Sequence, residues 1–106
     1  MSVKLVLLKS NEEVIADVQE LVDENDKVLF LVLTNPFTCK LVEAPEMLME
    51  GAESSEPRYS VQFFPWMPLS KDKRISIDPS WAVTIVEPTE MVKESYEARM
   101  NGTTGN

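Results

Sequence analysis

Residues 74–88 read R-I-S-I-D-P-S-W-A-V-T-I-V-E-P, two short β-forming runs separated by Asp78-Pro79-Ser80. Before the break, Ile75 and Ile77 alternate with polar residues, and residues 81–86 continue the alternation after it. A period of two is typical of a strand. Proline has a fixed φ and no amide hydrogen, so it cannot continue a paired strand. The stretch therefore predicts a strand, a tight turn and a second strand, in which the chain passes from one part of a sheet to another.

The rest of the chain predicts further short strands joined by polar turns. Alternating or continuously apolar runs predict strands at residues 3–8, 14–22, 28–33, 37–41 and 58–66. The alternation slips at Leu21-Val22, which predicts a β-bulge and a bent strand. Asn35-Pro36 separates the run at residues 28–33 from the run at residues 37–41. Either these runs form one strand that is kinked at the proline, or two strands meet there.

A single helix is predicted at the end of the chain. Thr89 is a suitable N-cap, and Val92, Tyr96 and Met100 fall on one helical face. We therefore expect one all-β domain over residues 1–88, a C-terminal helix over residues 89–100 and a disordered tail over residues 101–106.

Composition narrows the possible functions. The chain has 106 residues, with 10 Lys and Arg against 18 Asp and Glu, and its net charge of −8 repels phosphate at long range. A single cysteine excludes an internal disulfide and is typical of a reducing compartment. No apolar run is long enough to span a membrane, and no signal peptide pattern is present. We expect a cytoplasmic protein without membrane contact.

Catalysis is not expected. The chain has no histidine and one cysteine, which removes the usual general bases, nucleophile pairs and zinc ligands. Its three glycines form no phosphate-binding motif. The acidic run at residues 23–26 lacks the glycine and distal glutamate of a calcium loop, so a solvated turn is favoured over a metal site. We expect no enzyme activity, cofactor or metal.

The succession of short strands resembles the Sm-like family over residues 3–88. Residues 14–22 and 28–33 are similar to its first motif, and residues 75–85, with the tight break at Asp78-Pro79, are similar to its second. The resemblance implies an all-β fold with one terminal helix, a small, strongly bent, antiparallel barrel of the SH3-like kind. The acidic composition is similar to that of Sm-like proteins carried by phages, for which the compartment is the host cytoplasm.

The resemblance also implies self-assembly. In Sm-like rings the strand after the break pairs with a neighbouring subunit, which removes an exposed sheet edge. The candidate interface residues in this sequence are Trp81, Val83, Ile85 and Val86. The alternative is an ordinary central strand of a monomer. We expect a homo-oligomeric ring.

Two functions of such a ring remain open. One is binding of single-stranded RNA, in a chaperone-like role, with phosphate contacts from Lys71, Lys73 and Arg74 and base stacking on Trp66 or Tyr59. The alternative for these residues is a charged hairpin tip, with Trp66 packed in the core.

The second function is a homo-oligomeric module that binds another protein and has no RNA site. Its binding surface would be the acidic stretch at residues 43–57 or an apolar interface. Sm-like proteins that bind RNA carry a basic residue and a glycine at the break, whereas this chain has Asp78-Pro79, and an aspartate there repels phosphate.

Overall fold

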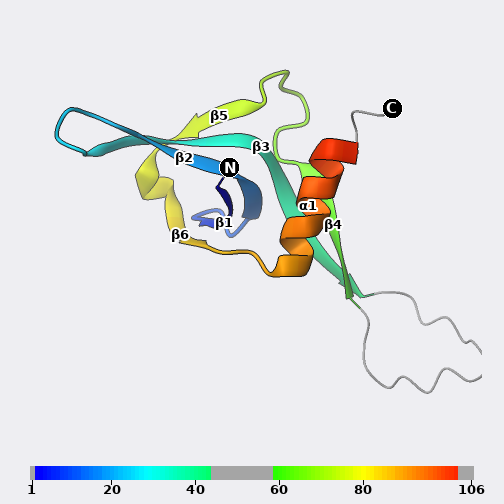
Figure 1. Cartoon of the computed structure of the whole chain (residues 1–106). Coiled ribbons are helices and arrows are strands. Elements are labelled where there is room, and N and C mark those ends of the chain that lie inside the picture. The colour runs from blue at the N-terminus through cyan, green and yellow to red at the C-terminus, as the bar shows by residue number, and fades with distance from the viewer. Residues whose placement is uncertain (1, 44–58, 103–106) are drawn as a thin grey trace, which may run out of the picture.

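The computed structural model describes residues 2–43 and 59–102. Six strands form one antiparallel sheet, followed by a C-terminal helix, as Figure 1 shows. The elements are β1 (Val3–Leu8), β2 (Glu13–Val22), β3 (Val28–Glu43), β4 (Tyr59–Pro65), β5 (Arg74–Ile77), a short 3₁₀ turn η1 (Pro79–Trp81), β6 (Ala82–Val86) and α1 (Glu90–Gly102). The predicted all-β fold with one terminal helix is confirmed.

The strand order is β4-β3-β2-β1-β6, and β5 also pairs with β3. The first half of β3 pairs with β5 over residues 31–34, and its second half pairs with β4 over residues 37–43. Strands β6, β4 and β5 each have one strand partner, so the described strands leave unpaired edges at both ends of the sheet. In this sense the sheet is open.

Strand β3 changes direction at Asn35-Pro36. Asn35 has a φ of 52°, in the left-handed region that asparagine tolerates better than most residues. Its amide donates to the Lys73 carbonyl at 2.6 Å, and the Pro36 carbonyl accepts from the Trp66 amide at 3.0 Å. Of the two possibilities that the sequence left open, the kinked single strand is therefore the observed one.

Strand β2 is also irregular. Its pairing with β3 shifts between Leu21 and Val22, where the sequence predicts a bulge, and the prediction is confirmed. A second shift lies between Ile15 and Asp17, where the apolar pattern gives no sign of it. Such shifts bend a strand and increase its twist.

The two faces of the sheet carry separate cores. Val14 and Ile15 are consecutive and point to opposite faces, and both are fully buried. On the face of the sheet to which Val14 points, buried side chains from β1, β2, β3 and β5 pack together. The opposite face, to which Ile15 points, is covered by Tyr96 of α1. Tyr96 stands nearly edge-on to the ring of Phe37, with 6.2 Å between centroids. Each face of the sheet is thus covered by a different part of the chain.

Helix α1 begins where the sequence predicts. The Thr89 hydroxyl accepts from the Val92 amide at 3.4 Å, and the Thr89 carbonyl accepts from the Lys93 amide at 2.9 Å. The helix continues through Asn101 to Gly102, two residues beyond the predicted boundary. Apart from Glu43, which ends β3, the acidic stretch predicted at residues 43–57 lies outside the described residues, as do residues 103–106 of the predicted tail. No helix in the described ranges combines the length and the apolar character needed to cross a membrane.

Candidate functional site

The end strand β6 exposes a row of apolar side chains. Trp81, Val83, Ile85 and Val86 are 45%, 59%, 40% and 48% exposed, although all four are large hydrophobic residues. Ile85 lies opposite Val6 and Val86 opposite Leu5, so the two side chains point to opposite faces of the sheet. The outer edge of β6 has no strand partner in the described structure. Three of the four predicted interface residues therefore lie on β6, whose outer edge is unpaired, and Trp81 is the last residue of η1, immediately before that strand.

The turn η1 fixes where β6 begins. The Asp78 carboxylate accepts from the Ser80 amide and the Ser80 hydroxyl, both at 2.8 Å. These hydrogen bonds favour the charged form and lower the pKa of Asp78. The Lys9 amide donates to the Trp81 carbonyl at 3.0 Å, and the Lys9 ammonium lies 5.8 Å from the centroid of the Trp81 ring. The indole is held at the end of the β1–β2 turn.

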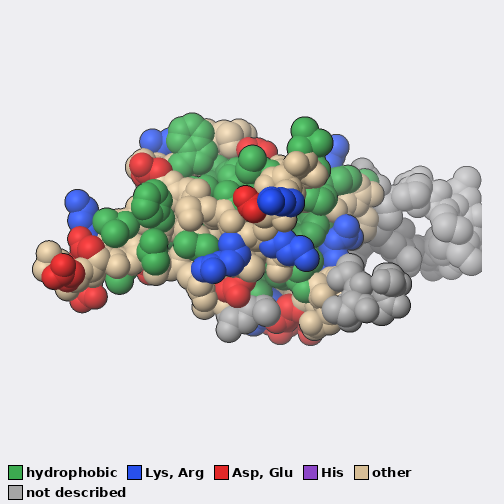
Figure 2. All heavy atoms as spheres, turned by 90° about the horizontal axis from the view of Figure 1, so that it is seen from above, with side chains coloured by type: hydrophobic (Ala, Val, Ile, Leu, Met, Phe, Trp, Pro, Cys, Tyr) green, Lys and Arg blue, Asp and Glu red, His purple; other side chains and the backbone are tan. Residues whose placement is uncertain are grey.

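Two of the three predicted basic residues, Lys71 and Lys73, lie in the connection between β4 and β5. Lys71, Lys73 and Arg74 are all exposed, and Arg74 is the first residue of β5. Lys71 and Lys73 line a hollow of about 250 Å³ together with Phe37 and Met67. Figure 2 shows Lys and Arg side chains gathered near the middle of one face and acidic side chains at the far end of the β2–β3 hairpin. Asp72 also lines this hollow, and Arg74 does not.

Trp66, one of the two predicted stacking residues, is not among the described residues that line that hollow. Trp66 is half-buried against the core on the Val14 face, and its Nε1 lies 3.4 Å from a Glu12 carboxylate oxygen, to which it donates. Tyr59 opens β4 opposite Glu43, and its side chain lies outside the described residues. The aromatic residue beside the lysines is instead Phe37, whose position follows from the kink at Pro36. In the sequence, only Pro36 could have indicated the position of Phe37, because a proline within a strand is a sign of a kink.

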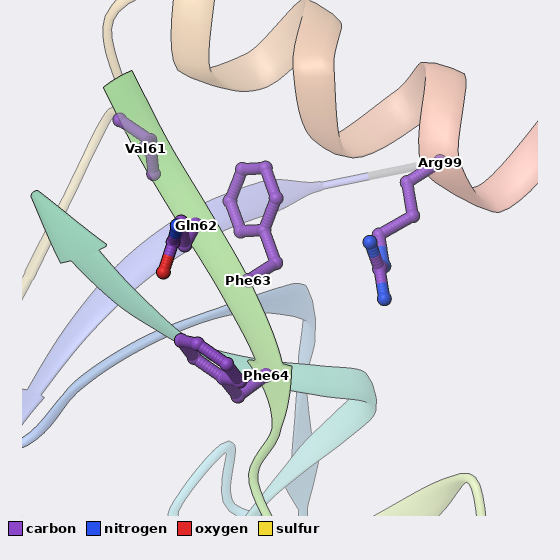
Figure 3. Close-up of a pocket in the computed structure, with 5 residues that line it drawn as sticks. All are labelled: Val61, Gln62, Phe63, Phe64 and Arg99. Carbon is purple, nitrogen blue, oxygen red and sulfur yellow. The ribbon is translucent and has the colours of Figure 1, made fainter. Parts of the chain in front are cut away.

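A second hollow lies along β4. It has a volume of about 380 Å³ and is lined by Val61, Gln62, Phe63 and Phe64 of β4 and Arg99 of α1, as Figure 3 shows. The Arg99 guanidinium lies 5.2 Å from the centroid of the Phe37 ring. Sequence reasoning missed this surface, because nothing in the spacing of β4 and α1 indicates that they lie side by side.

Two observations on the described residues concern their titratable groups. Burial, reinforced by the negative charge of Glu13, raises the pKa of the Cys39 thiol to about 11. Within residues 2–43 and 59–102, no three Asp, Glu or Cys side chains converge as metal ligands would. At the acidic turn, Asp23 instead accepts from the amides of Asn25 and Lys27 at 2.8 and 3.0 Å.

Comparison with known proteins does not assign the chain to a family. No protein-family model matches the chain, and no curated protein is similar to it.

Proposed function

We propose that the protein is a non-enzymatic subunit that assembles with copies of itself through β6. The observation that carries this proposal is the unpaired edge of β6 with apolar side chains exposed on both faces. Natural sheets normally protect such an edge, because it presents unpaired amides and carbonyls beside apolar surface. Pairing with another strand satisfies the backbone and removes the apolar area from water, at roughly 25 cal/mol per Å².

A second copy of the chain is the partner that this geometry favours. The sheet ends in β6 on one side and in β4 and β5 on the other, and these ends are different surfaces of the same molecule. Contact between the two ends is head-to-tail, which closes into a ring or continues as a filament. We further propose that each subunit is an Sm-like barrel, with η1 joining β5 to β6 across the opening of the sheet.

Light scattering coupled to size exclusion tests the assembly. The wild type is expected to elute as an oligomer, and Val83→Asp as a monomer, because a charge at the joint has no partner there. Leu21→Asp is the matched control: Leu21 is 51% exposed, but it lies on β2, which has a strand partner on both sides. A wild type that stays monomeric at high micromolar concentration refutes the proposal.

Binding of single-stranded RNA is a second candidate, favoured by the hollow that Lys71 and Lys73 share with Phe37. Lysines neutralise phosphate, and an aromatic ring accepts a stacked base. Repetition around a ring multiplies the local positive charge, although each chain carries a net charge of −8.

A titration with short U-rich and A-rich RNA at low and high salt tests this candidate. The variant Lys71→Glu with Lys73→Glu is expected to abolish binding, whereas Lys27→Glu at the β2–β3 turn keeps it. Absence of binding at low salt removes the RNA function and leaves a homo-oligomeric module that binds another protein.

A further inference from the structure

The hairpin turn between β2 and β3 is acidic and is bordered by exposed apolar side chains. It contains three acidic residues and one lysine. The Asp23 carboxylate accepts from backbone amides within the turn, whereas Glu24 and Asp26 are exposed and form no ion pair with the described residues. Val22 and Leu29, on either side of the turn, are 45% and 43% exposed. The turn therefore presents two unpaired carboxylates beside apolar surface.

The connection between β4 and β5 has the opposite charge. Leu69 is fully exposed at its tip, and Met67 is 50% exposed. The Ser70 amide donates to the Met67 carbonyl at 3.0 Å, which closes the tip as a tight turn. Lys71 and Lys73 follow, and neither ammonium forms an ion pair within residues 2–43 and 59–102. Positive charge thus lies beside a leucine that leaves its whole apolar area in water.

These two surfaces lie at opposite ends of the pairing between β3 and β5. Leu31 pairs with Ile77 at one end, and Thr34 pairs with Arg74 at the other. The hairpin turn lies beyond Leu31, and the connection from β4 reaches the paired region at Arg74. In Figure 1 the turn lies at the far left and the connection at the upper right, and Figure 2 also shows acidic side chains at the far left. The two surfaces of one chain therefore do not meet.

A second copy of the chain supplies the complementary surface. The turn carries three acidic residues and one basic residue, whereas residues 71–74 carry three basic residues and one acidic residue. Two copies arranged end to end bring these opposite charges together and cover the exposed apolar side chains beside them. Two turns placed together, or two connections, would instead oppose like charges, which costs free energy at an interface. Charge and apolar area both favour contact between a turn and a connection.

We infer that the β2–β3 turn of one copy docks against the β4–β5 connection of the next, with Glu24 and Asp26 facing Lys71 and Lys73. This axial contact runs along the strands, whereas the proposed joint at β6 runs across them. It goes beyond the proposed self-assembly because it adds a second direction of growth. A head-to-tail contact repeats from copy to copy, and salt weakens it because exposed charges take part.

Charge reversal tests the axial contact. Light scattering of the wild type at low salt is expected to show a mass that rises with protein concentration, and high salt is expected to suppress the rise. Glu24→Lys with Asp26→Lys, or Lys71→Glu with Lys73→Glu, is expected to raise the dissociation constant of this contact about tenfold. The variant with all four substitutions restores opposite charges and is expected to restore the rise. If it associates as weakly as either double variant, the inference fails.

The matched control for the acidic turn is Glu94→Lys with Glu97→Lys on α1, which makes the same change in net charge. It is expected to leave the concentration dependence unchanged. An equal loss in this control would mean that net charge, and not the turn, governs association, which contradicts the inference. Loss of association in the turn variant also distinguishes the axial contact from an RNA site at the lysines, because an RNA site does not require Glu24 or Asp26.

Cross-linking between engineered cysteines tests which surfaces meet. In a Cys39→Ser background, Asn25→Cys and Asp72→Cys place thiols at exposed positions of the turn and the connection. A short bismaleimide is expected to give a ladder of covalent oligomers only when both cysteines are present. Covalent dimers from Asn25→Cys alone, with no ladder from the pair, would mean that turn meets turn and would overturn the inference.

Val83→Asp separates this inference from the proposed function. A single axial contact is weaker than many acting together, so this variant is expected to be monomeric in size exclusion and to give the cysteine ladder only at high protein concentration. If the wild type has one constant oligomeric mass and the cysteine pair gives no ladder, the inference fails and the proposed function stands. If Val83→Asp associates and gives the ladder as readily as the wild type, the axial contact stands and the joint at β6 fails.

Discussion

The Tyr96 hydroxyl donates to the carbonyl oxygen of Asn35 at 2.9 Å, which connects the C-terminal helix to the kink of the longest strand. The carbonyl of Thr34 is a second acceptor at 3.3 Å. Both carbonyls lie where β3 turns, and Tyr96 is only 1% exposed. The helix thus contributes to the bend of β3 that separates β4 from β5.

Replacement of Tyr96 by phenylalanine is expected to lower the free energy of unfolding by about 1 kcal/mol. The variant keeps the packing of the ring and removes the donor, leaving carbonyls without their partner. Ser95→Ala is the control, because it removes an exposed hydroxyl from the preceding residue of α1. Urea unfolding measures both variants, and equal losses would contradict a specific role for the Tyr96 hydroxyl.

Alkaline pH is expected to destabilise the fold through the same side chain. Burial, together with the negative charge of Asp17, raises the pKa of Tyr96 from 10.0 to about 12. The unfolded chain therefore ionises first, so stability is full below pH 10 and is lost as the pH rises toward about 12. Thermal midpoints across this range should fall more steeply for wild type than for Tyr96→Phe, and identical slopes would refute the assignment.

The left-handed backbone at Asn35 predicts an unusual order of stabilities. Glycine adopts a φ of 52° without cost, whereas alanine is disfavoured there by about 1 kcal/mol. Asn35→Gly is expected to match the wild type in urea unfolding, and Asn35→Ala to fall below it. If alanine were as stable as glycine, the kink would not depend on this conformation.

The Cys39 thiol is expected to react slowly in the native protein. With its pKa raised to about 11, little thiolate is present near pH 8, and the thiolate is the reactive form. A chromogenic disulfide reagent should label the urea-unfolded chain much faster than the folded one. Glu13→Gln removes a negative charge that raises this pKa and should speed the native reaction, while equal native and unfolded rates would contradict the prediction.

Local patterns predicted most of the secondary structure. A period of two marked the strands, the phase slip at Leu21 marked a bulge, and Thr89 marked the start of the helix, because each depends on residues close in sequence. The irregularity near Ala16 left no such mark, since Val14, Ile15 and Ala16 are all apolar and buried, and a shift among them does not change the pattern.

The candidate sites were predicted unevenly. The four predicted interface residues, in η1 and β6, were identified because they fall within one short run with apolar residues on both faces, and their exposure is a finding of the structure. The pairing of Trp66 with the lysines was assumed from closeness in sequence, whereas the indole packs against the core and donates to Glu12. Side chains a few residues apart in a connection point in different directions, and sequence distance does not report this.

The sequence by itself determined an acidic chain of short antiparallel strands with one terminal helix and an apolar strand after Asp78-Pro79. Only the tertiary structure decided that β4 and β5 share one edge of β3, that β6 ends the sheet with both faces exposed, and that Arg99 lies beside β4. The physical reason is that strand pairing joins residues far apart in the chain. Composition and periodicity specify which face of a strand is apolar, but not which neighbour covers it.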